Sequence, residues 1–233
     1  MEKIYWFEEI ESTNEFAKTL VKEADEWTVV AADKQTKGKG RLGRNWYSPD
    51  GGLWFSVILK PTSLSHLITL VVGVAICEAM KELKINTRIK WPNDILIGGK
   101  KVAGILTEIE TNAIIVGIGI NLNVFDFPDE LGETATSILI ESGKVVDKKE
   151  VFLLVLNKLK EKYNRFKSDD IGELLNEWRI YSTTIGKIVS VETPSEVVNG
   201  EVVDIDDEDG ALLLRLPTGV IKKIFAGKCK LIR

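Results

Sequence analysis

Three stretches of the chain collect residue types that bind anions. The first runs from Lys37 to Arg44 (KGKGRLGR), where lysines and arginines alternate with glycines. The second is Lys90 to Asp94 (KWPND), and the third begins at Lys101. Arginine side chains fork onto phosphate or carboxylate oxygens, and glycines let the backbone approach a ligand closely. These stretches together favour a site for an anionic substrate, although a basic loop taken alone is more often simply solvated.

The glycine loop does not belong to either of the common nucleotide-binding motifs. Gly38 to Gly43 satisfies the G-x-G-x-x-G pattern of dinucleotide folds, but that motif requires a helix to begin at the glycines. Here residues 45–52 (NWYSPDGG) follow, and their turn chemistry leads into a strand. The phosphate-binding pattern G-x-x-x-x-G-K-[ST] does not occur anywhere in the sequence. A long loop of this kind inside a compact domain is usually functional.

The second stretch forms a corner between two apolar segments. Pro92 cannot donate to a sheet, so the strand must break there and present Asn93 and Asp94 at a strand end. Asp94 suits a hard cation such as magnesium together with nucleotide phosphates, whereas in isolation the pair could simply cap a turn. Lys100 and Lys101 open the next strand on opposite faces, so at most one of them points inward.

Small residues lie close to these polar groups. Gly104 follows Lys101 in the same strand, and Gly117 and Gly119 precede Asn121 in the next one. Glycine weakens a strand, and its repeated use suggests close approach by another backbone or by a ligand.

The elements that must position these groups can be predicted from apolar periodicity. Strands are expected at 4–7, 28–32, 53–59, 88–91, 95–97, 101–109 and 113–122, with Gly98-Gly99 as a two-residue hairpin turn. Helices are expected from Ser12, over 64–83, after the capping residue Asp147, and over 171–181, whereas 125–136 reads as irregular. Short β-rich runs after residue 185, separated by Asn199-Gly200, Asp209-Gly210 and Thr218-Gly219, predict a small β-barrel. The chain is thus divided into residues 1–185 and 186–233.

Composition excludes several classes of function. The net charge is -4, so the surface has no general attraction for nucleic acid. His66 is the single histidine, and the two cysteines, Cys77 and Cys229, match no zinc or redox spacing, so two reduced thiols in the core are expected. No signal peptide or membrane-spanning run is visible, which predicts a cytoplasmic protein.

Taken together and in order, these motifs resemble those of biotin–protein ligases, and the similarity covers essentially the whole chain. The residues that carry it are Ser12-Thr13-Asn14, Gln35, Gly38 to Arg44, Trp46, Lys90 to Asp94, Lys101 to Gly104 and Gly117 to Asn121. The resemblance implies an α+β fold, in which a mixed sheet with helices like that of class II aminoacyl-tRNA synthetases precedes a small SH3-like β-barrel.

The resemblance also implies roles for individual residues. The residues expected around biotin are Ser12, Thr13, Asn14, Gln35, Gly38, Lys39, Gly40, Trp46, Lys101, Gly104, Gly117 and Gly119. Those expected around ATP are Arg41, Arg44, Trp46, Asn93, Asp94, Lys101, Asn121, Ala135 and Thr136, with Asp94 also on the metal side. Lys101 would bridge the biotin carboxylate and the α-phosphate, and Arg41 and Arg44 would close over the adenylate; these three are the expected catalytic residues.

The implied activity is activation of biotin with ATP to biotinyl-5'-AMP, with Mg²⁺, followed by transfer of biotin to a lysine of a biotin carboxyl carrier domain. A homodimer is expected, and neither nucleic acid nor membrane is an expected partner. Two departures stand out: Lys39 replaces an arginine found in some members, and the sequence begins at the catalytic domain without a winged-helix segment. Ser12-x-x-Glu15 is also a capping box, so Ser12 could serve the helix instead of the ligand.

Two alternatives remain open at this point. A lipoate–protein ligase would share the fold and chemistry with a different acyl group. A non-catalytic biotin-sensing or nucleic-acid-binding module would use the basic loop as a phosphate patch, although the acidic balance speaks against it.

Overall fold

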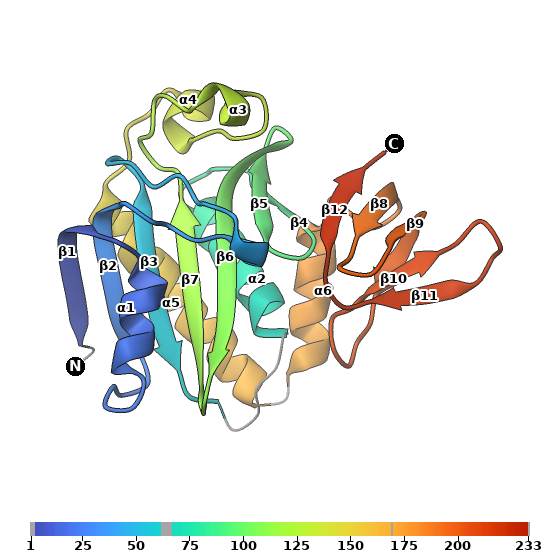
Figure 1. Ribbon diagram of the computed structural model, residues 1–233, viewed down its shortest axis with the longest axis horizontal. Helices are drawn as coiled ribbons and strands as arrows, with labels where there is room; N and C mark the ends of the chain where they lie inside the picture. Colours follow the sequence, from blue (N-terminus) through green and yellow to red (C-terminus); the bar gives the residue numbers. More distant parts are fainter. Residues whose placement is uncertain (1–2, 62–66, 169, 233) are drawn as a thin grey trace.

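The computed structural model describes residues 3–61, 67–168 and 170–232. Its main body is built on a seven-stranded mixed sheet with the order β1-β2-β3-β7-β6-β5-β4, in which β1 and β2 are parallel and the other neighbours antiparallel (Figure 1). The strands are β1 (Ile4–Ile10), β2 (Thr28–Gln35), β3 (Leu53–Leu59), β4 (Arg88–Lys90), β5 (Asp94–Ile97), β6 (Lys100–Glu110) and β7 (Ala113–Ile120).

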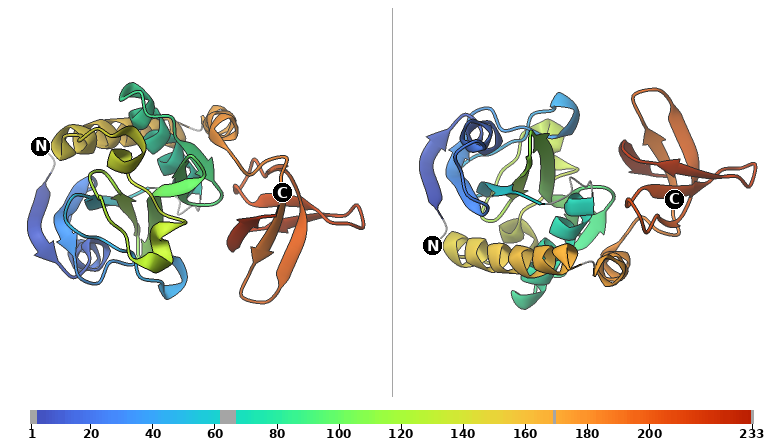
Figure 2. Two further views of the ribbon diagram at one scale, coloured as in Figure 1. Left: turned by 90° about the horizontal axis from the view of Figure 1, so that it is seen from above. Right: turned by 90° about the horizontal axis from the view of Figure 1, so that it is seen from below.

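The helices are α1 (Thr13–Leu20), α2 (Leu67–Glu82), α3 (Asp129–Gly132), α4 (Ile138–Ser142), α5 (Lys148–Lys167) and α6 (Ile171–Tyr181), with a single 3-10 turn, η1 (Arg41–Gly43), in the glycine loop. Helix α1 covers one face of the sheet and α2 and α5 cover the other (Figure 2). Side chains alternate along a strand, so Val30 packs with α1 while its neighbours Val29 and Ala31 pack on the opposite side. Both faces of the central strands are therefore buried, which explains their nearly continuous apolar sequence.

The C-terminal part forms a separate five-stranded antiparallel sheet with the order β11-β10-β9-β8-β12. Its strands are β8 (Ile188–Glu192), β9 (Val197–Ile205), β10 (Leu212–Arg215), β11 (Ile221–Ile224) and β12 (Lys228–Leu231). This sheet lies beside α6, next to the β4–β5 end of the large sheet (Figure 1). The expected fold, a mixed sheet with helices followed by a small β unit, is confirmed.

Several details of the predicted elements need correction. Asn199-Gly200 is not a turn, because β9 runs straight through it, and a side chain on Gly200 would lie 2.6 Å from the Arg215 carbonyl of β10. Residues 125–136 contain the short helix α3, and both α4 and β12 were not predicted. Residues 64–66 of the predicted helix, His66 among them, lie outside the described residues. Among the described residues no helix is long and apolar enough to cross a membrane.

Other local predictions are confirmed by the backbone. Gly98 and Gly99 both have positive φ, 58° and 87°, and join β5 to β6 as a tight hairpin. Asp147 caps α5 by accepting from the Glu150 amide at 2.8 Å. Both cysteines are free and buried.

Candidate active site

Two adjoining cavities open above the middle of the large sheet. The larger one, of about 630 Å³, lies between the glycine loop, the β4–β5 corner, the 121–135 segment and β12 of the small sheet. The smaller one, of about 50 Å³, is bounded by α1, the end of β2 and the glycine positions of β6 and β7. Five residues line both cavities, namely Gly40, Arg41, Trp46, Asn93 and Lys101. The two spaces therefore form one continuous cleft divided by these side chains.

The glycine loop is folded back on itself over this cleft. The Gly40 amide donates to the Arg44 carbonyl at 2.7 Å, and the Trp46 amide donates to the Gly38 carbonyl at 2.8 Å. A side chain on Gly38 would lie 2.5 Å from both the Trp46 carbonyl and Ser48 Oγ, so only glycine fits there. Only one 3-10 turn forms in the loop, in agreement with the exclusion of a dinucleotide-binding helix.

Arg41 reaches from the loop to the β4–β5 corner. Its Nη1 donates to Asn93 Oδ1 at 3.1 Å, and Asn93 Nδ2 in turn donates to the Ile105 carbonyl at 2.9 Å, which fixes the amide against β6. Burial lowers the pKa of Arg41, the Asp94 charge raises it, and the Arg44 charge lowers it further, with a net lowering. Within the described residues no carboxylate lies within ion-pair distance of Arg41, so its charge is partly desolvated and available to an anion.

Lys101 is the inward member of the Lys100–Lys101 pair. Its Nζ lies 2.5 Å from Asp94 Oδ1 and 4.8 Å from the centre of the Trp46 ring. Lys100 is exposed, as strand alternation predicts. The Lys101 backbone bridges Ala135, since Lys101 N donates to the Thr134 carbonyl and Thr136 N donates to the Lys101 carbonyl. This pairing brings the 121–135 segment against the cleft.

The Trp46 indole lies directly on the glycines of the sheet. A side chain on Gly119 would lie 2.5 Å from Trp46 Nε1, and one on Gly104 would lie 3.0 Å from Trp46 Cζ3. Trp46 Nε1 is buried and has no hydrogen-bond partner among the described residues. Trp46 therefore forms the wall between the two cavities, and β6 and β7 carry glycine there because the ring occupies the space of a Cβ.

The smaller cavity is lined by an organised set of polar groups. Gln35 Oε1 accepts from the Thr13 amide at 2.8 Å and from Thr13 Oγ1 at 3.1 Å, while Gln35 Nε2 donates to Ser48 Oγ at 2.9 Å. Ser12 caps α1, since its Oγ accepts from the Glu15 amide at 3.4 Å, and it also lines the cavity. The capping role and the lining role of Ser12 are thus compatible, because the Ser12 hydroxyl donates to no acceptor in the described part of the chain.

The far wall of the larger cavity is held by Asn121. Its Nδ2 donates to the Thr136 carbonyl at 2.8 Å, so the amide holds the 135–137 segment in place. Thr136 Oγ1 is directed away to Glu141 Oε1 at 2.6 Å, whereas Ala135 faces the cavity. Thr136 and Gly38 are the two predicted site residues that line neither cavity, and every other predicted site residue lines one or both.

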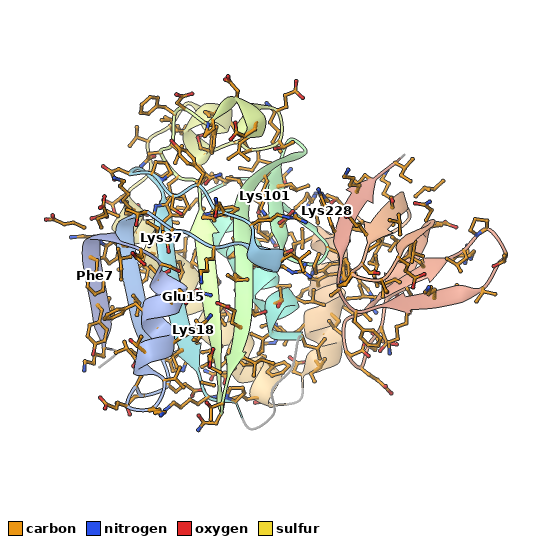
Figure 3. The ribbon with its side chains drawn as sticks, in the orientation of Figure 1. Phe7, Glu15, Lys18, Lys37, Lys101 and Lys228 are labelled. Atoms are coloured by element: carbon orange, nitrogen blue, oxygen red, sulfur yellow. The ribbon has the colours of Figure 1, made fainter. Side chains whose placement is uncertain are left out.

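The small sheet adds charges that the sequence had not indicated. Lys228 and Lys230 of β12 line the larger cavity together with Cys229, and Lys90 lines it from β4. Figure 3 shows Lys228 extending from the small sheet toward the Lys101 side of the cleft. The cationic residues lining this cavity are Arg41, Arg44, Lys90, Lys101, Lys228 and Lys230, against two carboxylates, Asp94 and Glu133. Only the alternation Lys228-Cys229-Lys230 could have signalled a strand with two lysines on one face.

This arrangement suits a polyanion lying in the larger cavity and a compact, hydrogen-bonding group in the smaller one. A chain whose net charge is -4 concentrates six cations around one cavity, so the local field opposes the overall charge. Lys101 and Arg41 lie on the border between the two cavities, where charge would develop if the two ligands reacted with each other.

Comparisons with known proteins agree with this geometry. Residues 6–124 match the Biotin/lipoate A/B protein ligase family, and residues 184–231 match the Biotin protein ligase C terminal domain. The bifunctional ligase/repressor BirA of Bacillus subtilis is 39% identical over 95% of this chain and 72% of its own length. The biotin–[acetyl-CoA-carboxylase] ligase of Paracoccus denitrificans is 31% identical over 90% of this chain and 92% of its own length.

A solved structure covers the entire chain. Biotin protein ligase from Aquifex aeolicus in complex with biotin and ATP superposes with a TM-score of 0.91 and 36% identity, covering 100% of both chains. From these matches and the two-cavity cleft, the chain belongs to the biotin/lipoate A/B protein ligase family, as one of its biotin protein ligases.

Proposed function

We propose that this protein joins biotin to a carrier lysine in two steps, with biotin's ring system in the smaller cavity and ATP in the larger one. The observation that carries the proposal is the placement of Lys101 and Arg41 on the border between the cavities. The Aquifex relative that superposes over the full chain was solved with biotin and ATP.

In the first step the biotin carboxylate attacks the α-phosphate of ATP and pyrophosphate leaves, which gives biotinyl-5'-AMP. Negative charge builds up at phosphorus, and cations fixed in advance near that position lower the barrier. We assign this role to Lys101, whose Nζ must exchange its ion pair with Asp94 for the ligand oxygens. Arg41 and Arg44 approach from the glycine loop, and Asn121 and Ala135 border the nucleotide side of the cavity.

The chemistry of the donor set fits magnesium bound mainly by phosphates. Asp94 is a single carboxylate at the cavity wall, and among the described residues there is no cluster of three or more potential metal ligands. Magnesium in nucleotide sites is commonly held by one or two carboxylates together with phosphate oxygens and water. When bound, it would offset charge on the phosphates, with Asp94 as its protein ligand once Lys101 turns to the substrate.

In the second step the amine of a carrier lysine attacks the biotinyl carbonyl and AMP leaves. A mixed anhydride hydrolyses in water, so the loop over the cleft must keep water out until the carrier arrives. We propose that the carrier is a biotin carboxyl carrier domain of a carboxylase, in agreement with the named activity of the Paracoccus relative. We further propose a homodimer and a cytoplasmic location; two buried free thiols are typical of a reducing compartment.

The decisive experiment separates the acyl group from the activity. The purified protein is mixed with magnesium-ATP and either biotin or lipoate, the acyl-adenylate is trapped and identified by mass, and a purified biotinyl carrier domain is then added. We expect an adenylate and a labelled carrier with biotin alone. An adenylate formed with lipoate and not with biotin would overturn the proposed substrate, and no adenylate with either acid would overturn the proposed reaction.

A further inference from the structure

Asn14 lies between the smaller cavity and a carboxylate on the neighbouring strand. It is 4% exposed and lines the cavity. Its Nδ2 donates to Glu108 Oε2 of β6 at 2.8 Å and makes a longer contact of 3.4 Å with the Leu106 carbonyl. Its Oδ1 accepts from Ser56 Oγ at 2.5 Å. The two hydrogens of the amide are therefore directed into the protein.

This arrangement limits what Asn14 can offer to a ligand. A primary amide has two N–H donors and an oxygen with two lone pairs. Because both donors already face acceptors, any hydrogen bond between Asn14 and a molecule in the cavity has to use the second lone pair of Oδ1. Asn14 is therefore an acceptor toward the ligand, and it selects a group that carries an N–H or O–H donor.

Glu108 is the group that fixes this orientation. An ionised carboxylate can only accept hydrogen bonds, so rotating the Asn14 amide by 180° would bring its oxygen against Glu108 Oε2. The other oxygen of Glu108 is paired with Lys18, whose Nζ lies 2.7 Å from Glu108 Oε1. Burial would lower the pKa of Lys18, but its hydrogen bonds to Glu108 and Glu15 raise it, so the ammonium is stable.

Further ion pairs connect Lys18 to the glycine loop. Glu15 Oε1 receives both Lys18 Nζ at 2.8 Å and Lys39 Nζ at 3.0 Å. Figure 3 shows Glu15 and Lys18 next to each other on α1, on its side toward β7 and β6. The carboxylate behind Asn14 is thus part of an alternating series of charges on α1, β6 and the loop, in which Glu108, Lys18 and Glu15 line neither cavity and Lys39 lines the smaller one.

We propose that Glu108 is a specificity-determining positioning residue: through Asn14 it presents an acceptor to the smaller cavity and so selects the N–H of a cyclic urea. The donors needed for the urea carbonyl are available on the same wall, since Gln35 Nε2 uses one hydrogen on Ser48 and the Ser12 hydroxyl donates to none of the described residues. A dithiolane ring, as in lipoate, has no N–H to give to Asn14. This inference rests on the proposed function and goes beyond it, because Glu108 lines neither cavity.

The test measures binding of free acids to the intact protein by calorimetry without ATP, so it does not depend on the chemical step. Glu108→Gln keeps the shape of the side chain but lets the Asn14 amide turn either way. We expect its Kd for biotin to rise about tenfold, with the same factor for desthiobiotin, since both carry the urea. Glu110→Gln is the matched control, because Glu110 is two residues further on the same face of β6 and its side chain takes part in no hydrogen bond or ion pair among the described residues.

A second variant exchanges the two side-chain types. Asn14→Asp alone places two carboxylates together, whereas Asn14→Asp combined with Glu108→Gln again gives a donor behind the pocket and an acceptor toward the ligand. We expect each single variant to weaken biotin binding and the double variant to bind more tightly than either. A Glu108→Gln protein that binds biotin normally, a double variant no better than the singles, or a loss for biotin with none for desthiobiotin would overturn the proposal. A wild-type protein that binds biotin but forms no adenylate would instead count against the proposed function alone.

Discussion

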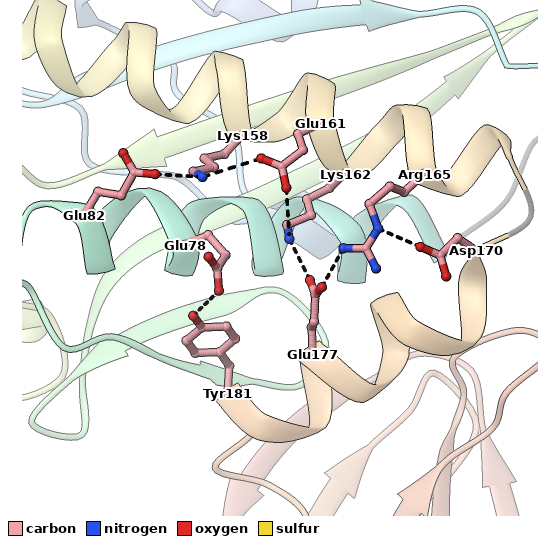
Figure 4. Close-up of polar contacts among 9 residues, drawn as sticks. All are labelled: Glu78, Glu82, Lys158, Glu161, Lys162, Arg165, Asp170, Glu177 and Tyr181. Atoms are coloured by element: carbon pink, nitrogen blue, oxygen red, sulfur yellow. Dashed lines mark hydrogen bonds and ion pairs between the residues drawn. The ribbon is translucent and has the colours of Figure 1, made fainter.

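Two cationic regions of this molecule differ in how their charges are neutralised. In the helix cluster, each lysine or arginine faces a carboxylate (Figure 4). The charged residues of this cluster lie on α2, on α5 and at or after the start of α6: Glu78, Glu82, Lys158, Glu161, Lys162, Arg165, Asp170 and Glu177. Lys162 lies 2.8 Å from Glu177, and Arg165 lies 2.5 Å from Glu177 and 2.7 Å from Asp170. Lys162 is 5% exposed in its side chain, so this ammonium has left water and depends on its partners.

The larger cavity of the cleft shows the opposite pattern. Of its six cationic residues only Lys101 has an ion pair, with Asp94, while Arg41, Arg44, Lys90, Lys228 and Lys230 have none with the described residues. Unpaired cations around one concave space repel one another and lower the stability of the empty protein. The comparison indicates that paired cations hold the helices together, whereas unpaired cations are kept for a polyanionic ligand.

The largest effect on turnover is expected when the ammonium group of Lys101, on the border between the two cavities, is removed. Lys101→Ala should reduce biotin-dependent pyrophosphate release by roughly 10²-fold, because no other side chain carries charge to the reacting oxygens from that strand. Lys100→Ala removes an exposed lysine next to it and serves as the control. Near-normal turnover of Lys101→Ala, with the fold intact by circular dichroism, would show that the paired lysine of the cleft is structural.

A smaller effect is expected at an unpaired cation of the loop. Arg41→Ala should form the adenylate and release it about tenfold faster, because the guanidinium loses its charge-assisted bonds to the phosphate. The measurement is the dissociation rate of isolated biotinyl-5'-AMP from the protein. The Asn93 amide that now accepts from Arg41 is anchored to Ile105 and should keep its place, so thermal stability should change little. An unchanged dissociation rate would mean that the loop does not retain the intermediate.

The sequence predicted the cleft better than it predicted the charges across it. Local patterns were sufficient for the glycine loop, the break at Pro92 and the placement of Lys100 and Lys101 on opposite faces, because turn chemistry and strand alternation are properties of neighbouring residues. The choice of Lys101 as the inward lysine came from the family resemblance. The cations of β12 come from the other sheet, and only tertiary packing brings Lys228 to the same cavity as Lys101. The predicted turn at Asn199-Gly200 was wrong for a related reason. Gly200 is required there for close packing against β10 and not for a turn.

Glu108, behind the smaller cavity, shows the same limit of prediction from sequence. In the sequence it is one of several polar residues near the end of a strand, and nothing local connects it to Asn14. The two residues meet because α1 packs over β3 and β7, where Gly117 leaves room for the Asn14 amide to reach Glu108 on the next strand, β6. A residue that acts on a ligand through another residue therefore has to be identified from the structure, even where the residues lining the pocket can be predicted.

The smallest effect concerns the helix cluster, where loss of a partner should affect stability and leave catalysis unchanged. Burial would raise the pKa of Glu177, but its hydrogen bonds to Arg165 and Lys162 outweigh this and lower the pKa below its ordinary value of 4.5. A carboxylate with a lowered pKa in the folded state stabilises the protein above pH 4.5, and this contribution disappears as the pH falls through the folded-state pKa. Glu177→Gln should therefore cost about 1 kcal/mol of unfolding free energy at pH 7, measured by urea titration, and should lose less stability than wild type on acidification from pH 5 to about pH 3. Its biotin-dependent pyrophosphate release should equal that of wild type at a temperature where both are folded. If this variant instead lost turnover while keeping its stability, the result would contradict the conclusion that paired cations stabilise the fold and unpaired cations serve the ligand.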